Sequence, residues 1–161
     1  MYKKKPLFIT FEGIEGSGKS YQALRLYKNL KKKNISSILT REPGGTRSAE
    51  KIREVILKDY FHPESKEKFN KYTDTLLYLA ARNEHLENKI RPAIKKKKII
   101  ICDRFIDSTS AYQIYGKGVN KNFINSIHKY ILQGIKPNLT FVLIANISKA
   151  MKRLNKRKNK N

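Results

Sequence analysis

The sequence has one cysteine, no tryptophan and no long hydrophobic run in its 161 residues. A lone cysteine, Cys102, cannot form a disulfide within the chain, which fits a reducing compartment, so we expect a cytoplasmic protein. No apolar run approaches the roughly 18 residues that a membrane span needs, and no membrane partner is expected. The apolar stretch behind the basic residues 1–5 is too short for the core of a signal peptide, so we expect no secretion signal.

Acidic residues are also scarce. Thirteen Asp and Glu stand against 36 Lys and Arg, giving a formal net charge of +23. Such a charge is compatible with a nucleic-acid partner or an anionic membrane. The basic residues are dispersed, however, and the lysine clusters at 31–33 and 95–98 fall at expected helix ends, where cations suit the helix dipole. We therefore expect nonspecific affinity for polyanions and no specific nucleic-acid partner.

Short apolar runs alternate with longer amphipathic stretches along the chain. Strands are expected at 7–12, 36–40, 98–102 and 139–145. Helices are expected at 19–33, 47–59, 72–91, 108–113 and 120–134. Pro92 is expected to kink or restart the third helix, and Ser148 to cap a last one. The alternation predicts one α/β domain over residues 1–161, a doubly wound parallel sheet with helices on both faces.

A glycine-rich segment that fits G-x-x-x-x-G-K-[ST] follows the first expected strand and opens the first expected helix. It consists of Gly13, Ile14, Glu15, Gly16, Ser17, Gly18, Lys19 and Ser20. Backbone N–H groups of such a loop point at phosphate oxygens, and the helix N-terminus adds its positive end. Lys19 supplies a charge to the β- and γ-phosphates, and the Ser20 hydroxyl can ligate Mg²⁺. This P-loop predicts a site for ATP with Mg²⁺.

An acid and an arginine, Asp103 and Arg104, end the third expected strand. Ligands of an open α/β sheet bind at the carboxyl ends of its strands. Asp103 could hold Mg²⁺ through water, while Arg104 could clamp phosphoryl oxygens; an ordinary ion pair is the alternative for these two residues alone. The three histidines, His62, His85 and His128, have no spacing that suggests a metal site, and we expect them to be structural.

Three segments behind the P-loop resemble the thymidylate kinase family. They read TREPGGT at 40–46, LLYLAAR at 76–82 and DRFIDSTSAYQ at 103–113, and the resemblance covers residues 6–157. It implies the P-loop fold of nucleoside monophosphate kinases and transfer of the γ-phosphoryl group of ATP to dTMP, giving dTDP for dTTP synthesis. It also implies a homodimer with ATP and dTMP as ligands and Mg²⁺ as cofactor.

The resemblance implies a role for each residue that matches a family position. The dTMP site is matched to Glu15, Arg53, Tyr78, Arg82, Arg104, Thr109 and Tyr112. Tyr78 would stack on thymine, and Arg82 and Thr109 would bond to the base. Tyr112 would crowd a ribose 2′-hydroxyl and so favour deoxyribose. From pattern alone, Tyr78 and Tyr112 are equally compatible with core packing.

The same resemblance assigns the remaining contacts of the substrate. Glu15 would accept from the sugar 3′-hydroxyl, and Arg53 and Arg104 would contact the phosphate of dTMP. Lys19 and Arg104 would supply positive charge to the transferring group.

The P-loop contains no arginine, so the resemblance implies a catalytic arginine in a lid that begins at about residue 150. Arg153 and Arg157 are its candidates. Against the family's pattern the chain is expected to be C-terminally incomplete, without the last strand and closing helices. The fourth strand would then be an uncovered apolar edge. Three alternatives stay open: an inactive nucleotide-binding fragment, a kinase for another nucleoside or nucleotide, and a basic P-loop ATPase that binds nucleic acid.

Overall fold

A computed structural model describes residues 6–61 and 67–158, the side chains of 59–61 and 157–158 excepted. Its sheet has four parallel strands: β1 (Phe8–Glu12), β2 (Ser37–Arg41), β3 (Ile99–Asp103) and β4 (Leu139–Val142). Their order is β2-β3-β1-β4, with Phe8 opposite Ile100 and Ile9 opposite Leu139. The predicted parallel α/β sheet is confirmed, and each expected strand is present.

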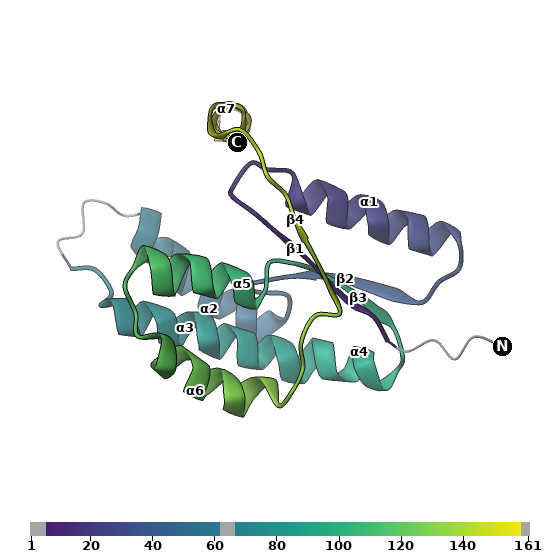
Figure 1. Cartoon of the computed structure of the whole chain (residues 1–161), viewed down its shortest axis with the longest axis horizontal. Helices are drawn as coiled ribbons and strands as arrows, with labels where there is room; N and C mark the ends of the chain where they lie inside the picture. The colour runs from purple at the N-terminus through teal and green to yellow at the C-terminus, as the bar shows by residue number, and fades with distance from the viewer. Residues whose placement is uncertain (1–5, 62–66, 159–161) are drawn as a thin grey trace.

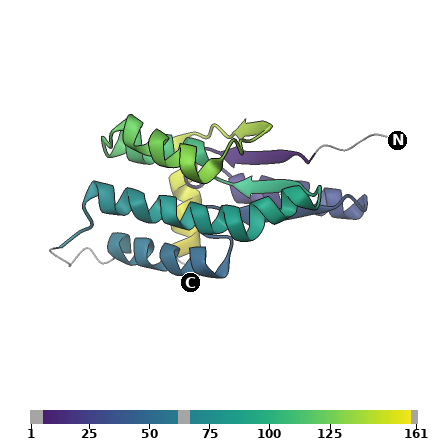
Figure 2. The same ribbon diagram turned by 90° about the horizontal axis from the view of Figure 1, so that it is seen from below.

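Helices cover both faces of this sheet. They are α1 (Lys19–Lys32), α2 (Arg47–Phe61), α3 (Lys71–His85), α4 (Arg91–Lys95), α5 (Ile106–Thr109), α6 (Lys121–Leu132) and α7 (Ile147–Lys158). Two π-helical segments, η1 (Leu86–Ile90) and η2 (Ser110–Gly116), join α3 to α4 and extend α5. Helix α1 lies above the sheet and α4 below it (Figure 1). The run from α3 through η1 to α4 crosses the lower face (Figure 2).

Side-chain alternation along the strands creates a separate apolar core on each face. Phe8, Ile100 and Cys102 point to the lower face and pack against Leu86 and Phe105. The residues between them, including Ile9, Phe11 and Ile101, point to the upper face, where they meet the apolar stripe of α1. That stripe consists of Ala23, Leu26, Tyr27 and Leu30, whose spacing is that of one helix face.

Local chemistry explains where the helices depart from the sequence expectations. The expected helix at 72–91 is divided, because Pro92 restarts it as α4 after the η1 turn. The prediction that Ser148 caps the last helix was wrong, because α7 begins one residue earlier, at Ile147. The side-chain oxygen of Asn146 accepts from the backbone N–H of Lys149 at 3.3 Å and provides the cap.

Strand β4 forms one edge of the sheet and pairs only with β1 among the strands described. Phe141 stacks on Phe11 with ring centroids 5.2 Å apart, but Val142 is 65% exposed. The expectation of an uncovered apolar edge is therefore confirmed for the described residues. None of the helices in the described part of the chain has the length and apolar character required to span a bilayer.

Candidate functional site

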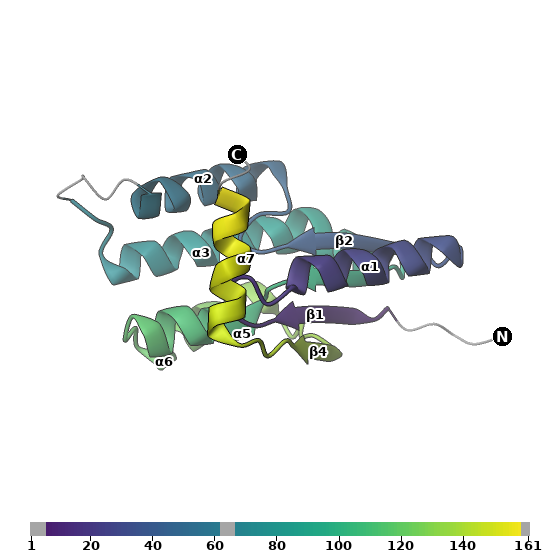
Figure 3. The ribbon, with the colours of Figure 1, turned by 90° about the horizontal axis from the view of Figure 1, so that it is seen from above.

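The P-loop is packed closely against the segment that follows β4. A Cβ atom on Gly13 would lie 2.4 Å from the carbonyl oxygen of Leu143, and one on Gly16 would lie 2.5 Å from that of Ala150. Both glycines also have positive φ, at 136° and 73°. Only glycine fits at these two positions. The close approach brings the first half of α7 across the loop, as the view from above makes clear (Figure 3).

Two polar groups of the P-loop have few protein partners. The Nζ of Lys19 donates to the carbonyl oxygen of Ile14 at 2.7 Å, within the same loop. Burial, together with the charge of Arg104, lowers the pKa of Lys19. The Oγ of Ser17 is buried and has no hydrogen-bond partner among residues 6–61 and 67–158. Phosphate oxygens are suitable partners for a hydroxyl and an ammonium group held in this way.

The two residues predicted to hold Mg²⁺ are brought together. The hydroxyl of Ser20, in the first turn of α1, donates to Oδ2 of Asp103 at the end of β3. The other carboxylate oxygen, Oδ1, is buried without a partner in the described part of the chain. Mg²⁺ prefers oxygen ligands, so this pair fits the ion. No group of three or more His, Cys, Asp or Glu among the described residues could hold a metal, and His62 lies outside them.

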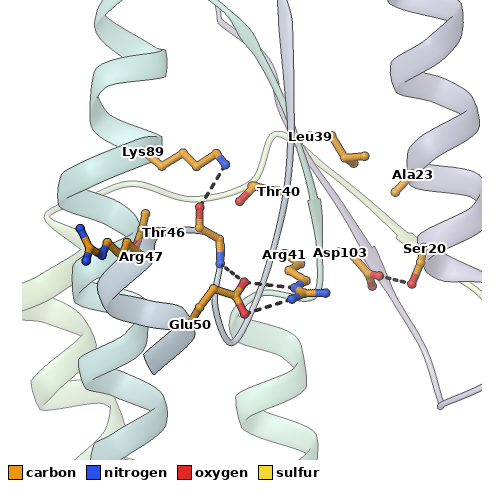
Figure 4. A pocket seen from close by; sticks show the side chains of 11 residues that line it. Ser20, Ala23, Leu39, Thr40, Arg41, Thr46, Arg47, Glu50, Lys89 and Asp103 are labelled. Carbon is orange, nitrogen blue, oxygen red and sulfur yellow. Dashed lines mark hydrogen bonds and ion pairs between the residues drawn. The ribbon is translucent and has the colours of Figure 1, made fainter. Parts of the chain in front are cut away.

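A cavity of about 470 Å³ opens beside Ser20 and Asp103. Its walls come from α1, the end of β2, the loop after it and α2 (Figure 4). Glu50 holds the loop: its Oε2 lies 3.0 Å from Nη2 of Arg41, and its Oε1 accepts from the N–H of Gly45 at 2.8 Å. Burial alone would raise the pKa of Glu50, but these bonds outweigh it and lower the pKa.

Arg53 also contacts this loop. Its Nη1 donates to the carbonyl oxygen of Pro43 at 2.9 Å, and its Nε lies 3.9 Å from Oε2 of Glu50. The peptide bond between Glu42 and Pro43 is cis. Sequence reasoning proposed Arg53 from the resemblance but missed Glu50, which has the look of an ordinary helical surface acid.

Arg104 lies between the P-loop and α5. Its Nη2 donates to Oε1 of Glu15 at 2.6 Å, and its Nη1 donates to the hydroxyl of Ser108 at 2.9 Å. The guanidinium carbon is 5.3 Å from the centroid of the Tyr112 ring. Burial would raise the pKa of Glu15, but Arg104 outweighs it and the pKa is lowered. Arg104 has φ of 70°, a left-handed conformation that is uncommon for residues other than glycine.

Glu12 is a buried acid that sequence reasoning missed. Its Oε1 accepts from the N–H of Phe105 at 2.7 Å, and its Oε2 accepts from the hydroxyl of Ser108 at 2.6 Å. Burial raises the pKa of Glu12, although both hydrogen bonds oppose the shift. Because Ser108 also binds Arg104, Glu12 connects the strand before the P-loop to the predicted phosphate contact. An acid ending an apolar strand was the available signal.

The residues matched to the base have different environments. Tyr78 is half-buried, Thr109 is buried and Tyr112 is 44% exposed. Arg82, on the same helix as Tyr78, is only 3% exposed and forms an ion pair with Glu42. Sequence reasoning therefore missed that Arg82 has extensive protein partners.

The two predicted lid arginines belong to α7. The Nη1 of Arg153 donates to the carbonyl oxygen of Gly16 at 3.1 Å, so this residue reaches the P-loop. The side chain of Arg157 lies outside the described residues.

Comparisons with known proteins point to one family. The sequence model of the family described as "Thymidylate kinase" matches residues 11–161. A thymidylate kinase of Halothermothrix orenii is 44% identical over 147 residues, which cover 91% of this chain and 68% of that protein. One of Wolbachia pipientis subsp. Culex pipiens is 46% identical over 158 residues, covering 96% and 71%. The crystal structure of thymidylate kinase from Ehrlichia chaffeensis superposes with a TM-score of 0.77 at 36% identity, covering 96% of this chain and 80% of that one.

Proposed function

Because this chain belongs to the thymidylate kinase family, we propose that it transfers the γ-phosphoryl group of ATP to dTMP, giving dTDP and ADP. The observation that carries the proposal is the contact between Arg104 and Glu15, with Nη2 and Oε1 at 2.6 Å. This contact joins the residue matched to the acceptor's phosphate to the loop matched to ATP. Donor and acceptor would thus meet at the carboxyl end of the sheet.

The reaction needs alignment and charge more than covalent chemistry. A phosphate oxygen of dTMP attacks the γ-phosphorus of ATP, and the bond from that phosphorus to the β,γ-bridging oxygen breaks. Lys19 would exchange its bond to the Ile14 carbonyl for the β- and γ-phosphate oxygens. Arg104, held by Glu15 and Ser108, would contact the acceptor phosphate. Arg153 of α7 would reach the transferring group from the opposite side, with Arg157 the second candidate.

Ser20 and Asp103 are the residues that would hold Mg²⁺. When bound there, the ion would supply positive charge to the phosphates. The chain's own contribution is to keep a hydroxyl and a carboxylate together at the start of α1 and the end of β3.

For the acceptor, we propose that Tyr78 stacks on the base while Arg82 and Thr109 bond to its edge. Tyr112, which lies over Arg104, would limit the space beside the sugar. Arg53 would extend from its bond to Pro43 toward the phosphate, and Glu15 would accept from the 3′-hydroxyl. Family membership also supports a cytoplasmic homodimer. Light scattering after gel filtration would test the oligomeric state.

Titration calorimetry, with ATP in one experiment and dTMP in another, tests the assignment of the donor and of the acceptor. Tyr78→Ala should weaken dTMP binding roughly tenfold to a hundredfold, because a base stacked on an aromatic ring is stabilised by about 1–3 kcal/mol. ATP binding should be unchanged. The matched control is Tyr130→Ala, which removes a tyrosine that is 82% exposed on α6. Binding of ATP without any binding of dTMP to the unaltered protein would overturn the assignment of the acceptor.

A further inference from the structure

The guanidinium of Arg82 is held by three elements besides its own helix. Its Nε and Nη2 lie 2.8 and 2.7 Å from Oε2 of Glu42, just beyond β2. Nη2 also donates to the carbonyl oxygen of Phe105 at 3.1 Å, where the chain enters α5. Nη1 lies 2.7 Å from Nε2 of His128, on α6. Every nitrogen of the group therefore has a protein partner.

Counting hydrogens leaves one donor uncommitted. An arginine carries five N–H hydrogens. Glu42 accepts the hydrogen of Nε and forms an ion pair with Nη2, which also donates to Phe105, and one hydrogen on Nη1 faces His128. The second hydrogen on Nη1 has no partner among residues 6–61 and 67–158. A ligand atom that bonds to Arg82 would therefore meet a single N–H beside His128.

Glu42 cannot readily release the guanidinium. Its second oxygen, Oε1, lies 2.9 Å from Nδ1 of His85, and Nε2 of His85 lies 2.6 Å from the hydroxyl of Thr40. Burial would raise the pKa of Glu42, but Arg82 and His85 outweigh it and lower the pKa, so the carboxylate stays ionised. Glu42 and the Phe105 carbonyl thus fix the plane of the guanidinium, and His128 determines which Nη1 hydrogen is free.

His128 is suited to accept rather than donate. Burial, followed by the charge of Arg82, lowers the pKa of His128 to about 4, so the ring is neutral near pH 7. An arginine has no acceptor, so the hydrogen bond requires a lone pair on Nε2 and places the ring proton on Nδ1. A protonated ring would instead repel the guanidinium.

We propose that His128 is a positioning residue for base selection, which occupies one Nη1 hydrogen of Arg82 so that a single N–H is presented to the base. The inference rests on the proposed function, since it takes the base to lie against Arg82. A lone N–H is satisfied by a carbonyl oxygen, as in thymine, and not by an exocyclic amino group, as in cytosine. Without His128, Nη1 has two free hydrogens, and water that bonds to them competes with the thymine carbonyl.

The test compares three variants in steady-state kinetics with dTMP and with dCMP. His128→Phe fills the space but removes the acceptor, and it should lower the ratio of kcat/KM for dTMP to that for dCMP about tenfold, the effect of one bond to a charged group. The loss should appear in the KM for dTMP, with kcat changed less than about twofold. His128→Gln restores an acceptor and should return the ratio to within about threefold. Asn125→Ala, on the exposed side of the same helix, is the matched control.

Thermal unfolding establishes that each variant is folded. If His128→Phe does not fold, His128→Ala with imidazole added to the buffer replaces it, and imidazole should restore the dTMP preference. Equal losses for dTMP and dCMP, or a ratio unchanged in His128→Phe, would overturn the inference while leaving the proposed function intact. An unaltered protein with no preference for dTMP would overturn both.

Discussion

Single acidic side chains hold the loops of this site in position. Glu12, Glu42 and Glu50 each bind either a backbone N–H or an arginine from another element. Their partners lie on other segments: the N–H of Phe105 before α5, the side chain of Arg82 on α3 and the N–H of Gly45 before α2. Truncating a buried hydrogen-bonded charge leaves its partner unsatisfied, so Glu12 and Glu42 are more sensitive positions than their appearance in the sequence indicates.

The depressed pKa of His128 predicts a loss of stability in acid. In the unfolded chain this residue takes up a proton near pH 6.5, but in the folded chain only near pH 4. Between these values the unfolded state binds more protons, so stability falls as the pH is lowered through the window and is retained above it. Through this residue, lowering the pH from about 7.5 to about 4.5 should reduce the free energy of unfolding by about 2 kcal/mol.

Urea unfolding of the unaltered protein and of His128→Gln at both pH values measures this contribution. Glutamine does not titrate, so the variant should lose about 2 kcal/mol less than the unaltered protein over the same interval. The other titrating groups, Glu12 and Glu42 among them, are present in both proteins and cancel in the comparison. Identical losses would show that His128 is not held neutral by its surroundings.

Residue chemistry could be predicted where a local motif carries it. The P-loop identified Lys19 and Ser20, and the strand end identified Asp103, because the geometry of such turns is encoded in consecutive residues. Glu12 and Glu42 could not be found in this way, since Phe105 and Arg82 lie 93 and 40 positions away from them. His128 was expected to be structural, and its bond to Arg82 depends on how α6 packs beside α3.

At the scale of elements, the contact between α7 and the P-loop determines how the lid helix is held. Ala150 is buried against Gly16, and Arg153 donates to the carbonyl oxygen of the same glycine. The helix is otherwise exposed along much of its length. Its position therefore depends on the absence of a side chain at residue 16.

Gly16→Ala should detach α7 from the P-loop, because the added Cβ would lie 2.5 Å from the Ala150 carbonyl oxygen. Trypsin should then cleave after Lys152 or Arg153 about tenfold faster, as expected for local opening that costs little. Gly118→Ala is the matched control: its φ of 64° imposes a comparable backbone strain, but nothing lies within 4 Å of the new atom. Mass spectrometry of the fragments locates the cuts, and equal cleavage rates in the two variants would contradict the contact.

Element existence was easier to predict than element detail. All four strands were expected from short apolar runs, and the continuous isoleucines of β3 are typical of a strand buried on both faces. The π-helical segments were not expected, since one extra residue per turn barely alters an apolar repeat. The cap of α7 was misplaced by two residues because Asn146 and Ser148 offer the same capping chemistry.

At the scale of the whole molecule, the parallel sheet rearranges a charge distribution that looks even in the sequence. The lysines at 31–33 and 95–98 precede β2 and β3, which are neighbours, with the N–H of Ile99 bonded to the carbonyl oxygen of Ser36 at 3.0 Å. Both clusters therefore lie at the amino end of the sheet, away from the site at its carboxyl end. Polyanions attracted there would not occupy the site of phosphoryl transfer. Strand order was not predictable from periodicity, so neither was this convergence.

The most direct test of the account is the initial rate of ADP release with ATP and Mg²⁺ across dTMP, dUMP, dCMP, dAMP and thymidine, with double-stranded and single-stranded DNA as further additions. The proposed function predicts a kcat/KM for dTMP at least about tenfold above that for every other acceptor, no stimulation by DNA, and loss of the rate in Lys19→Met. Faster turnover of another acceptor, or an ATPase rate that rises with DNA and not with dTMP, would contradict it.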